Sequence, residues 1–239
     1  MSEMAKKLFG KARAGGAGDE AHWLSVSDLM AGLMMVFLFI SIALMRDALI
    51  ERDRIQSVAV AYQENQVAIF EALHDEFADD LEAWQATIDR DSLAFEFQSP
   101  DVLFGTGRTE VQPLFAELLD DFFPRYVETL LQFRDSIDEV RLEGHTDSIW
   151  AGAASELEAY FHNMALSQGR TRSVLNYVFD LSAVAEYRDW LKTHFAAVGF
   201  SSSRPVLDES EREDREASRR VTFRVITNAE TQIRRIIED

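Results

Sequence analysis

Residues 23–45, WLSVSDLMAGLMMVFLFISIALM, constrain the fold of this chain more than any other feature. From Leu29 to Met45, seventeen consecutive residues carry no charge. With residues 23–28, the segment reaches the roughly 20 residues that a membrane-spanning helix needs. It leads into RDALIERDR without a small-residue cleavage pattern, which favours an uncleaved signal anchor over a signal peptide. We therefore expect one transmembrane helix over residues 23–45.

Basic residues set the expected orientation of this helix. Four of them precede the apolar segment and three follow it: Lys6, Lys7, Lys11 and Arg13 before, and Arg46, Arg52 and Arg54 after. Because Lys and Arg are enriched on the cytoplasmic flank, this modest asymmetry favours a cytoplasmic N-terminus. We therefore expect residues 1–22 to form a cytoplasmic tail, and the chain beyond residue 45 to lie outside the inner membrane.

The apolar segment contains one carboxylate, Asp28, near its first turn. At about 1.5 Å per residue, Asp28 lies roughly 7–8 Å along the helix axis from Trp23, just inside the hydrocarbon. One interpretation is a helix N-cap at the membrane surface. The other is a proton-carrying acid, because an ionisable side chain is costly inside a membrane and marks an ion pathway. A single helix cannot enclose such a pathway, so the second interpretation requires a polytopic partner.

Composition excludes several classes of function. The 42 acidic and 24 basic residues give a formal net charge of −18, whereas nucleic-acid binding needs a basic face. The chain has no cysteine, and its five His residues never occur at metal-ligand spacing, so we expect neither a metal nor a cofactor. It also lacks a glycine-rich phosphate loop and a nucleophile elbow. We therefore expect a protein that is not an enzyme.

Residues 46–90 have the pattern of a long helix. The segment contains neither Pro nor Gly, and its apolar residues recur at steps of three and four. A continuous helix of this length would extend some 65–70 Å, which is typical of a stalk. Its apolar stripe either packs on its own domain or pairs with a second copy of the chain, and we favour pairing.

Residues 91–239 alternate between strand and helix patterns. The strand patterns cover residues 92–98, 138–145 and 219–227, and the helix patterns cover residues 113–135, 163–181 and 183–199, the last with a glycine stop at Gly199. A short terminal helix follows, and the acidic segment 208–220 is expected to be solvated. Together these patterns predict an α/β sandwich with its helices on one face of the sheet.

Several short motifs occur in order within residues 92–227. They are DVLFGTGRTEVQPLF, LEGHTDS, an Asn at position 163, LSQGRTRSV and SRRVTFRV. In this order they resemble an OmpA-like peptidoglycan-binding domain. The resemblance implies that Asp147, beside Thr146, and Arg170 bind the diaminopimelate of wall peptides. It also implies supporting roles for Asn163 and for Arg220 or its neighbour Arg219.

The chemistry of these residue types suits that ligand. Diaminopimelate carries an ammonium and a carboxylate on one carbon, so its binding needs an acid and a fork-shaped donor held together. The alternative is that Asp147 caps a helix and that Arg170 is a surface residue pairing with it. The chain departs from the family in the extra residues 148–162 and in Ser218. The loop with Ile149 and Trp150 could cover the site or mediate dimer contacts.

Taken together, the tail, span, stalk and domain resemble the MotB family of motor stators. Within that family, WLSVSDLMAGLMMVFLFI most resembles the B-subunits of the Zorya anti-phage defence system. The resemblance implies a homodimer inside a ring of polytopic A-subunits of the ZorA type. In such a motor Asp28 would carry the proton, and the outer domain would hold peptidoglycan.

Other interpretations of the same parts stay open. A flagellar stator subunit has the same parts, a passive cell-wall anchor would not need Asp28, and an enzyme acting on the wall has the least support. We favour H+ over Na+ as the coupled ion, because the neighbours of Asp28 are largely apolar and offer few oxygen ligands besides serines. Na+ coupling stays open, because partner helices would supply most ion ligands.

Overall fold

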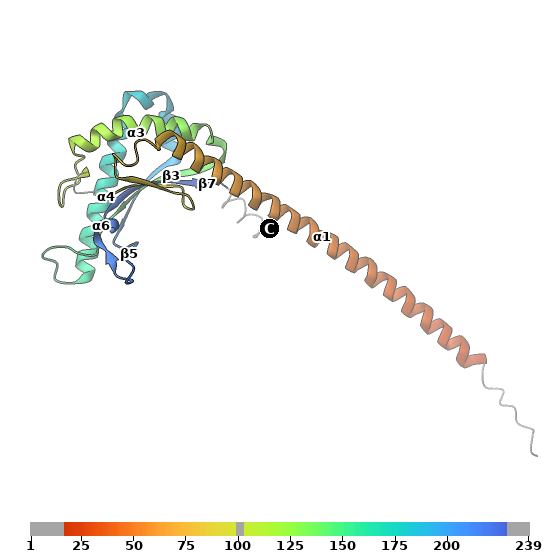
Figure 1. Cartoon of the computed structure of the whole chain (residues 1–239). Coiled ribbons are helices and arrows are strands. Elements are labelled where there is room, and N and C mark those ends of the chain that lie inside the picture. Colours follow the sequence, from red (N-terminus) through yellow and green to blue (C-terminus); the bar gives the residue numbers. More distant parts are fainter. Residues whose placement is uncertain (1–16, 99–102, 229–239) are drawn as a thin grey trace, which may run out of the picture. The chain divides into compact units, whose positions relative to one another are not determined.

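The computed structural model describes residues 17–98 and 103–228, with side chains from residue 26 onward except those of residues 58, 59, 61 and 62. The chain divides into two compact units, residues 1–56 and residues 57–239. One helix, α1 (Ala17–Phe77), begins in the first unit and ends in the second (Figure 1). The expected membrane helix over residues 23–45 is therefore part of a longer continuous helix.

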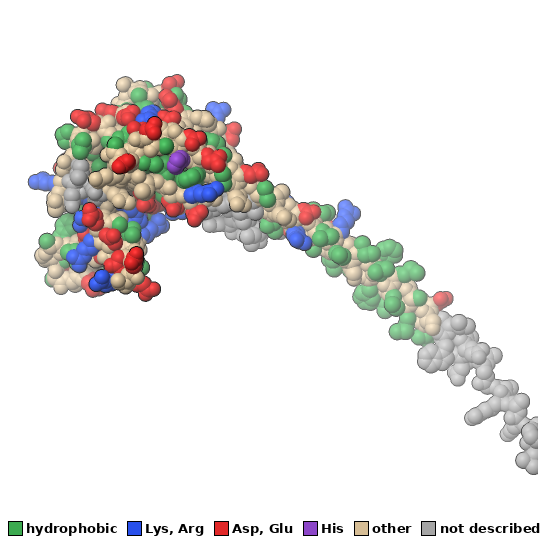
Figure 2. Space-filling model, viewed as in Figure 1, with side chains coloured by type: hydrophobic (Ala, Val, Ile, Leu, Met, Phe, Trp, Pro, Cys, Tyr) green, Lys and Arg blue, Asp and Glu red, His purple; other side chains and the backbone are tan. Residues whose placement is uncertain are grey.

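In the first unit, α1 has an apolar surface. The stretch Val26–Ser57 is long and apolar enough to cross a membrane. Its large hydrophobic side chains between Leu29 and Met45 are 49–73% exposed, and Figure 2 shows them gathered along the helix. A helix that is apolar all round must be covered by protein or by lipid. The predicted long apolar helix is confirmed.

The second unit contains a five-stranded sheet with the strand order β1-β2-β7-β3-β4. Its strands are β1 (Ala86–Asp89), β2 (Ala94–Gln98), β7 (Arg220–Thr227), β3 (Ile137–His145) and β4 (Phe195–Ser201). β4 runs parallel to β3, and the other neighbours are antiparallel. The strands that the sequence predicted, β2, β3 and β7, therefore lie together in the sheet.

Two helices, α3 (Pro113–Leu131) and α4 (Glu156–Asp180), cover one face of this sheet (Figure 1). The core between α3 and the sheet is aromatic. The ring of Phe122 lies 4.7 Å from that of Phe95, 5.0 Å from that of Phe97 and 5.2 Å from that of Phe223. The predicted α/β sandwich with its helices on one face is confirmed.

The end of α1 belongs to this core. Ile69, Leu73 and Phe77 are fully buried there. The expected helix over residues 46–90 ends at Phe77 instead, because residues 86–89 form β1 and pair with β2. Residues 78–90 are therefore wrongly predicted as helix, and the last part of the apolar stripe packs on its own domain, which was the less favoured alternative.

Two other helix expectations need correction. The helix expected over residues 163–181 begins earlier, at Glu156, and the one expected over residues 183–199 ends at His194. Its last residues form β4, because they pair with the parallel neighbour β3. The expected terminal helix lies outside the described residues. The remaining short elements are η1 (Arg134–Ser136), η2 (Ser182–Tyr187), α5 (Arg188–His194), β5 (Val206–Leu207), β6 (Glu213–Asp214) and α6 (Arg215–Ser218).

Candidate functional site

The close packing of α4 on the sheet positions the candidate site, and glycines make it possible. A Cβ on Gly144 would lie 2.8 Å from the backbone oxygen of Ser167, and a Cβ on Gly199 would lie 2.5 Å from the backbone nitrogen of Gln168. No side chain fits at either position without moving α4. The Ser167 hydroxyl also accepts a hydrogen bond of 3.1 Å from the Ser201 backbone at the end of β4.

Asp147 lies two residues beyond the end of β3, and its carboxylate is held in place. Oδ1 accepts a hydrogen bond of 3.0 Å from the Ile149 backbone nitrogen, and Oδ2 accepts one of 3.0 Å from Nη1 of Arg219. The residue is 9% exposed. The bond to Ile149 closes a local turn rather than capping a helix, because the next helix begins at Glu156 and has Ser155 as its N-cap. The second carboxylate oxygen contacts a cation.

The helix α4 supplies two further predicted residues. Nδ2 of Asn163 donates to the backbone oxygens of Asp147 and Ile149, at 3.0 and 3.2 Å. Arg170 follows Asn163 by seven residues, about two helical turns, so both lie on one face of α4. Arg170 Nε donates to the Arg108 backbone oxygen at 3.0 Å. Arg170 is 5% exposed, so it is not the surface residue of the alternative interpretation.

These residues line one cleft of about 310 Å³. Its lining is Thr106, Gly107, Thr146, Asp147, Ile149, Trp150, Ala151, Asn163, Leu166, Arg170 and Arg219. The structure thus brings together four residues that the sequence predicted. The fifth, Arg220, lies outside the cleft lining, with Nε 3.5 Å from Oε1 of Glu96 on β2. The residue next to it in the sequence, Arg219, lines the cleft instead.

Sequence reasoning missed part of this lining. Thr106 and Gly107 come from the FGTG stretch, which contributed to the family resemblance but received no role. Gly107 has a φ of +66°, a backbone conformation that favours glycine, and this explains the residue type. Leu166 lacked any signal of its own, because a leucine on a helix is ordinarily a core residue.

A buried polar network lies at the end of β3, the interior strand that precedes Asp147. His145 Nε2 lies 3.2 Å from Oε2 of Glu143, which Arg204 approaches at 3.3 Å. The His145 ring stacks on Phe200 with centroids 5.3 Å apart. Burial lowers the pKa of His145 below its usual value, although the Glu143 carboxylate opposes this shift. A neutral imidazole therefore ends β3 at neutral pH.

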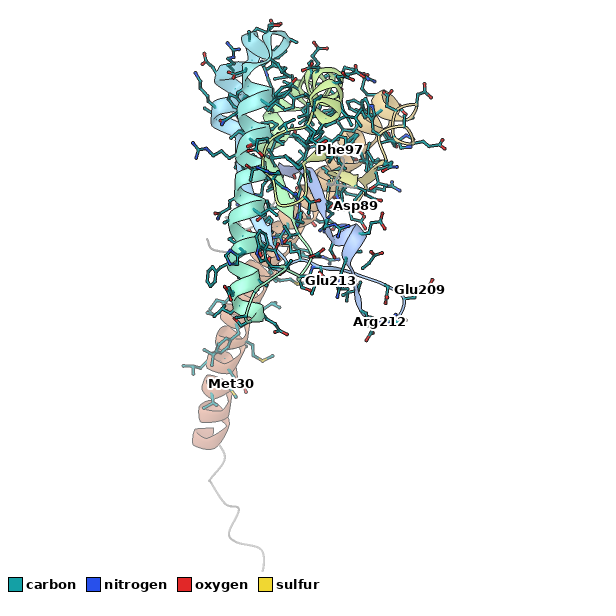
Figure 3. The ribbon with its side chains drawn as sticks, turned by 90° about the vertical axis from the view of Figure 1, so that its left-hand side faces the viewer. Met30, Asp89, Phe97, Glu209, Arg212 and Glu213 are labelled. Atoms are coloured by element: carbon teal, nitrogen blue, oxygen red, sulfur yellow. The ribbon has the colours of Figure 1, made fainter. Side chains whose placement is uncertain are left out.

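A protruding hairpin also contacts the site. Ser148 donates a 2.9 Å backbone hydrogen bond to Oε1 of Glu213, a residue of β6. Figure 3 shows Glu209 and Arg212 farther out on the same projection. The acidic segment expected to be solvated thus fastens the loop after Asp147 at its base.

The cleft combines groups that suit a zwitterionic ligand. Asp147 can pair with an ammonium, and Arg170 and Arg219 place guanidinium groups beside it for a carboxylate. The Thr146 hydroxyl is buried at the same cleft and has no hydrogen-bond partner within the part of the chain that the structure describes. A buried hydroxyl without a partner is costly, and a ligand could remove that cost.

Other chemistry finds less support in the described ranges. Among residues 17–98 and 103–228, no group of three or more His, Asp or Glu side chains could hold a metal ion. Asp28 lies on α1 in the first unit, where its side chain is exposed within the apolar stretch. Its role in carrying a proton stays a prediction.

Comparisons with known proteins place the chain in a family. No family model matches it. Among solved structures it is similar to the cell wall anchor of the T6SS from Pseudomonas aeruginosa, at 25% identity over 65% of this chain and 96% of that chain, with a TM-score of 0.45. A putative MotB like protein from Desulfovibrio vulgaris is 19% identical over 74% of this chain and 94% of that chain, also with a TM-score of 0.45.

The sequence comparison is more extensive. The Zorya protein ZorB of Escherichia coli is 54% identical over 233 residues, which are 98% of this chain and 99% of that protein. Identity at this level, over nearly all of both sequences, includes the apolar helix and the α/β domain alike. The chain therefore belongs to the family of the Zorya protein ZorB.

Proposed function

We propose that this chain is the B-subunit of a proton-driven, stator-type motor of the bacterial inner membrane, and that its α/β domain anchors the motor to peptidoglycan. One observation carries the proposal: Asp147, Arg170 and Arg219 meet in a single cleft with Asn163 and Thr146. Membership in the ZorB family and the apolar helix in the same chain support it. The role is that of a motor component rather than an enzyme.

In this proposal α1 crosses the inner membrane once. The N-terminus is cytoplasmic, as the basic residues before the span favour, and the α/β domain is periplasmic, where the cell wall lies. A wall-binding domain and a membrane helix on one chain then hold the motor stationary relative to the wall.

The wall ligand we propose is the diaminopimelate of a stem peptide. Its free ammonium pairs with Asp147, and its carboxylate pairs with Arg170 and Arg219. Nη1 of Arg219 lies 3.0 Å from Oδ2 of Asp147, so the acid and one guanidinium that this ligand needs already stand together in the cleft. Charged partners of this kind form the strongest hydrogen bonds in proteins and select for geometry.

The motor itself requires partners. Two copies of this chain would form a homodimer whose membrane helices lie inside a ring of polytopic ZorA-like A-subunits. The two Asp28 carboxylates would bind and release protons in alternation. Moving one charge across 100 mV supplies about 2.3 kcal/mol, so the proton gradient can drive rotation of the ring. The coupled ion is H+, and the proposal needs no cofactor.

The biological role we propose is defence against phage. The test substitutes Asp28→Asn, which keeps the shape of the side chain and removes its titration. We expect loss of proton flux in proteoliposomes that contain the A-subunit, and loss of protection in a plaque assay. Asp28→Glu should retain part of the proton flux and part of the protection. The control is Asp47→Asn, which removes an acid of the same helix beyond the apolar run and should leave flux and protection unchanged.

The outcomes separate this proposal from its rivals. If Asp28→Asn keeps wild-type proton flux and protection, the motor role is refuted and the passive wall anchor is the remaining interpretation. Restoration of swimming in a strain without its flagellar stator would favour a flagellar subunit.

Anchoring is tested separately by cosedimentation of the full chain with isolated cell-wall sacculi. Asp147→Asn keeps the acceptor for the Ile149 backbone but loses the charge, so we expect at least tenfold weaker binding. Asp189→Asn is the matched control, because the Asp189 side chain is 99% exposed on α5. If the wild-type chain, Asp147→Asn and Asp189→Asn bind sacculi equally well, the cleft does not anchor the chain to the wall.

A further inference from the structure

The cleft has an apolar wall beside its charged groups, and that wall has no role so far. Trp150, Ile149 and Leu166 line it. The indole of Trp150 stacks on the imidazole of His162, with centroids 5.0 Å apart and ring planes 18° from parallel. Trp150 is part of the cleft lining and His162 is not, so the imidazole supports the indole without itself lining the cleft.

The wall is fixed before any ligand binds. The Ile149 backbone nitrogen donates to Asp147, and the Ile149 backbone oxygen accepts from Asn163 at 3.2 Å. Farther along, the Ser155 hydroxyl caps α4 by accepting from the Glu158 backbone at 3.2 Å, and Glu158 accepts from the Ala154 backbone at 2.7 Å. A preformed apolar surface of this kind loses little conformational entropy when it is covered.

The reach of the wall identifies which part of a wall fragment it meets. Trp150 follows Asp147 by three residues, so their α-carbons lie at most about 10–11 Å apart. From the free ammonium end of a diamino acid, that span covers its methylene chain and the adjoining peptide unit. The sugar is attached two residues farther along the stem. A peptide unit attached to a diamino acid seated on Asp147 is therefore within reach of the wall, and the sugar is beyond it.

We propose that Trp150, with Ile149 and Leu166, forms a second subsite that binds the stem peptide adjoining the diamino acid. This inference rests on the proposed wall-binding function of the cleft. Trp150 is then a specificity-determining residue, because the subsite favours a diamino acid within a peptide over the free amino acid. Each buried methylene equivalent contributes about fourfold in affinity, so covering two or more gives at least about tenfold.

The test measures binding of three probes to the detergent-solubilised full chain by calorimetry. The probes are free meso-diaminopimelate, the tripeptide Ala-γ-Glu-diaminopimelate and the same tripeptide attached to its disaccharide. We expect the tripeptide to bind at least about tenfold more tightly than the free diamino acid, with no further gain from the disaccharide. Trp150→Ala should abolish the gain for the tripeptide and leave the free diamino acid within about twofold.

Controls separate the subsite from general damage. Trp190 stacks on His194 in the same manner, with centroids 4.8 Å apart, but lies outside the cleft lining, so Trp190→Ala should keep the tripeptide gain. Trp150→Tyr keeps an aromatic side chain in the wall and should keep most of the gain in affinity for the tripeptide. Melting temperatures verify that each variant folds.

Four results would overturn the inference when the wild-type protein does bind the probes. They are an undiminished tripeptide gain in Trp150→Ala, an equal loss for all three probes, a gain that first arises with the disaccharide, and wild-type protein that binds the free diamino acid as tightly as the tripeptide. In the last case the proposed anchoring function stands without the subsite. Wild-type protein that binds none of the three probes refutes both.

Discussion

The substitution Gly199→Ala tests whether the packing of α4 on the sheet sets the geometry of the cleft. A Cβ at this position would lie 2.5 Å from the Gln168 backbone nitrogen and 2.6 Å from the Ser167 hydroxyl oxygen. Ordinary contact begins near 3.4 Å, so α4 must move away by about 0.9 Å. The first of these atoms belongs to the backbone of α4, so rotating a side chain does not relieve the strain.

Two effects follow, and they can be measured independently. Overpacking of this kind costs about 1–3 kcal/mol, which lowers the melting temperature by about 2–12 °C for a domain of this size. The shift also displaces Asn163 and Arg170, which lie on the same helix. Binding constellations tolerate about 0.5 Å, so affinity for the diaminopimelate tripeptide should fall about tenfold.

The control for stability alone is Val178→Ala, a buried position near the end of α4. It leaves a cavity and costs a comparable amount, about 1–3 kcal/mol, without pushing the helix away from the sheet. Thermal unfolding and calorimetric titration of the two variants give the comparison. Equal affinities in the two variants would refute the argument that α4 positions the site, and an unchanged melting temperature in Gly199→Ala would refute the packing.

Three further predictions concern the stability of the domain. Burial lowers the pKa of His145 below 6.5, so the imidazole of the unfolded chain takes up its proton before that of the folded chain as the pH falls. The free energy of unfolding should therefore decline below about pH 6.5, by at most about 1.4 kcal/mol per pH unit. Urea titrations of His145→Gln should show a weaker decline. The guanidinium of Arg125 on α3 lies 2.7 Å from Glu76, 2.9 Å from Asp80 and 4.8 Å from the centre of the Phe77 ring. Arg125→Met should therefore lower the free energy of unfolding in urea by about 1–2 kcal/mol. The control Arg134→Met, at an exposed arginine, should lower it by under about 0.5 kcal/mol. The buried hydroxyl of Tyr126 has no hydrogen-bond partner within the described residues, so Tyr126→Phe should raise the melting temperature, and a lower one would contradict this reasoning.

The elements that sequence patterns predicted well are those whose local signals agree with their packing. Pro113 occupies the first turn of α3, where its missing N–H and fixed φ suit a helix start. Alternation of apolar and polar residues in β2 reflects one buried face, and Phe95 and Phe97 occupy that face. In such segments the tertiary structure adds nothing that contradicts the local pattern.

The errors fall where tertiary pairing overrides local preference. Residues 195–199, FAAVG, continue a helical pattern, and only the free edge of β3 makes them a strand. There Gly199 is required by the approach of α4 rather than by a helix end. Likewise, no Pro or Gly marks the end of α1 at Phe77; the chain turns through Gln85, at a φ of +50°, to reach β1.

The choice between Arg219 and Arg220 shows the same limit at the scale of one residue. Val221 is buried beneath the helices, so the alternation of β7 directs Arg220 to the opposite face of the sheet, where it meets Glu96. Arg219 precedes the strand and is not bound by that alternation. The sequence motif identifies both arginines as candidates for the site. Which of them lines the cleft depends on the residue at which β7 begins.

The extra residues between Asp147 and Arg170 leave the geometry of the site intact for a specific reason. They form a loop and the first turns of α4, and the side chain of Asn163 returns to the backbone of Asp147 and Ile149. That amide fixes the distance between the strand end and the helix whatever the length of the loop between them. Added length is therefore directed outward, where it can form a new wall, and the acid and the arginines keep their places.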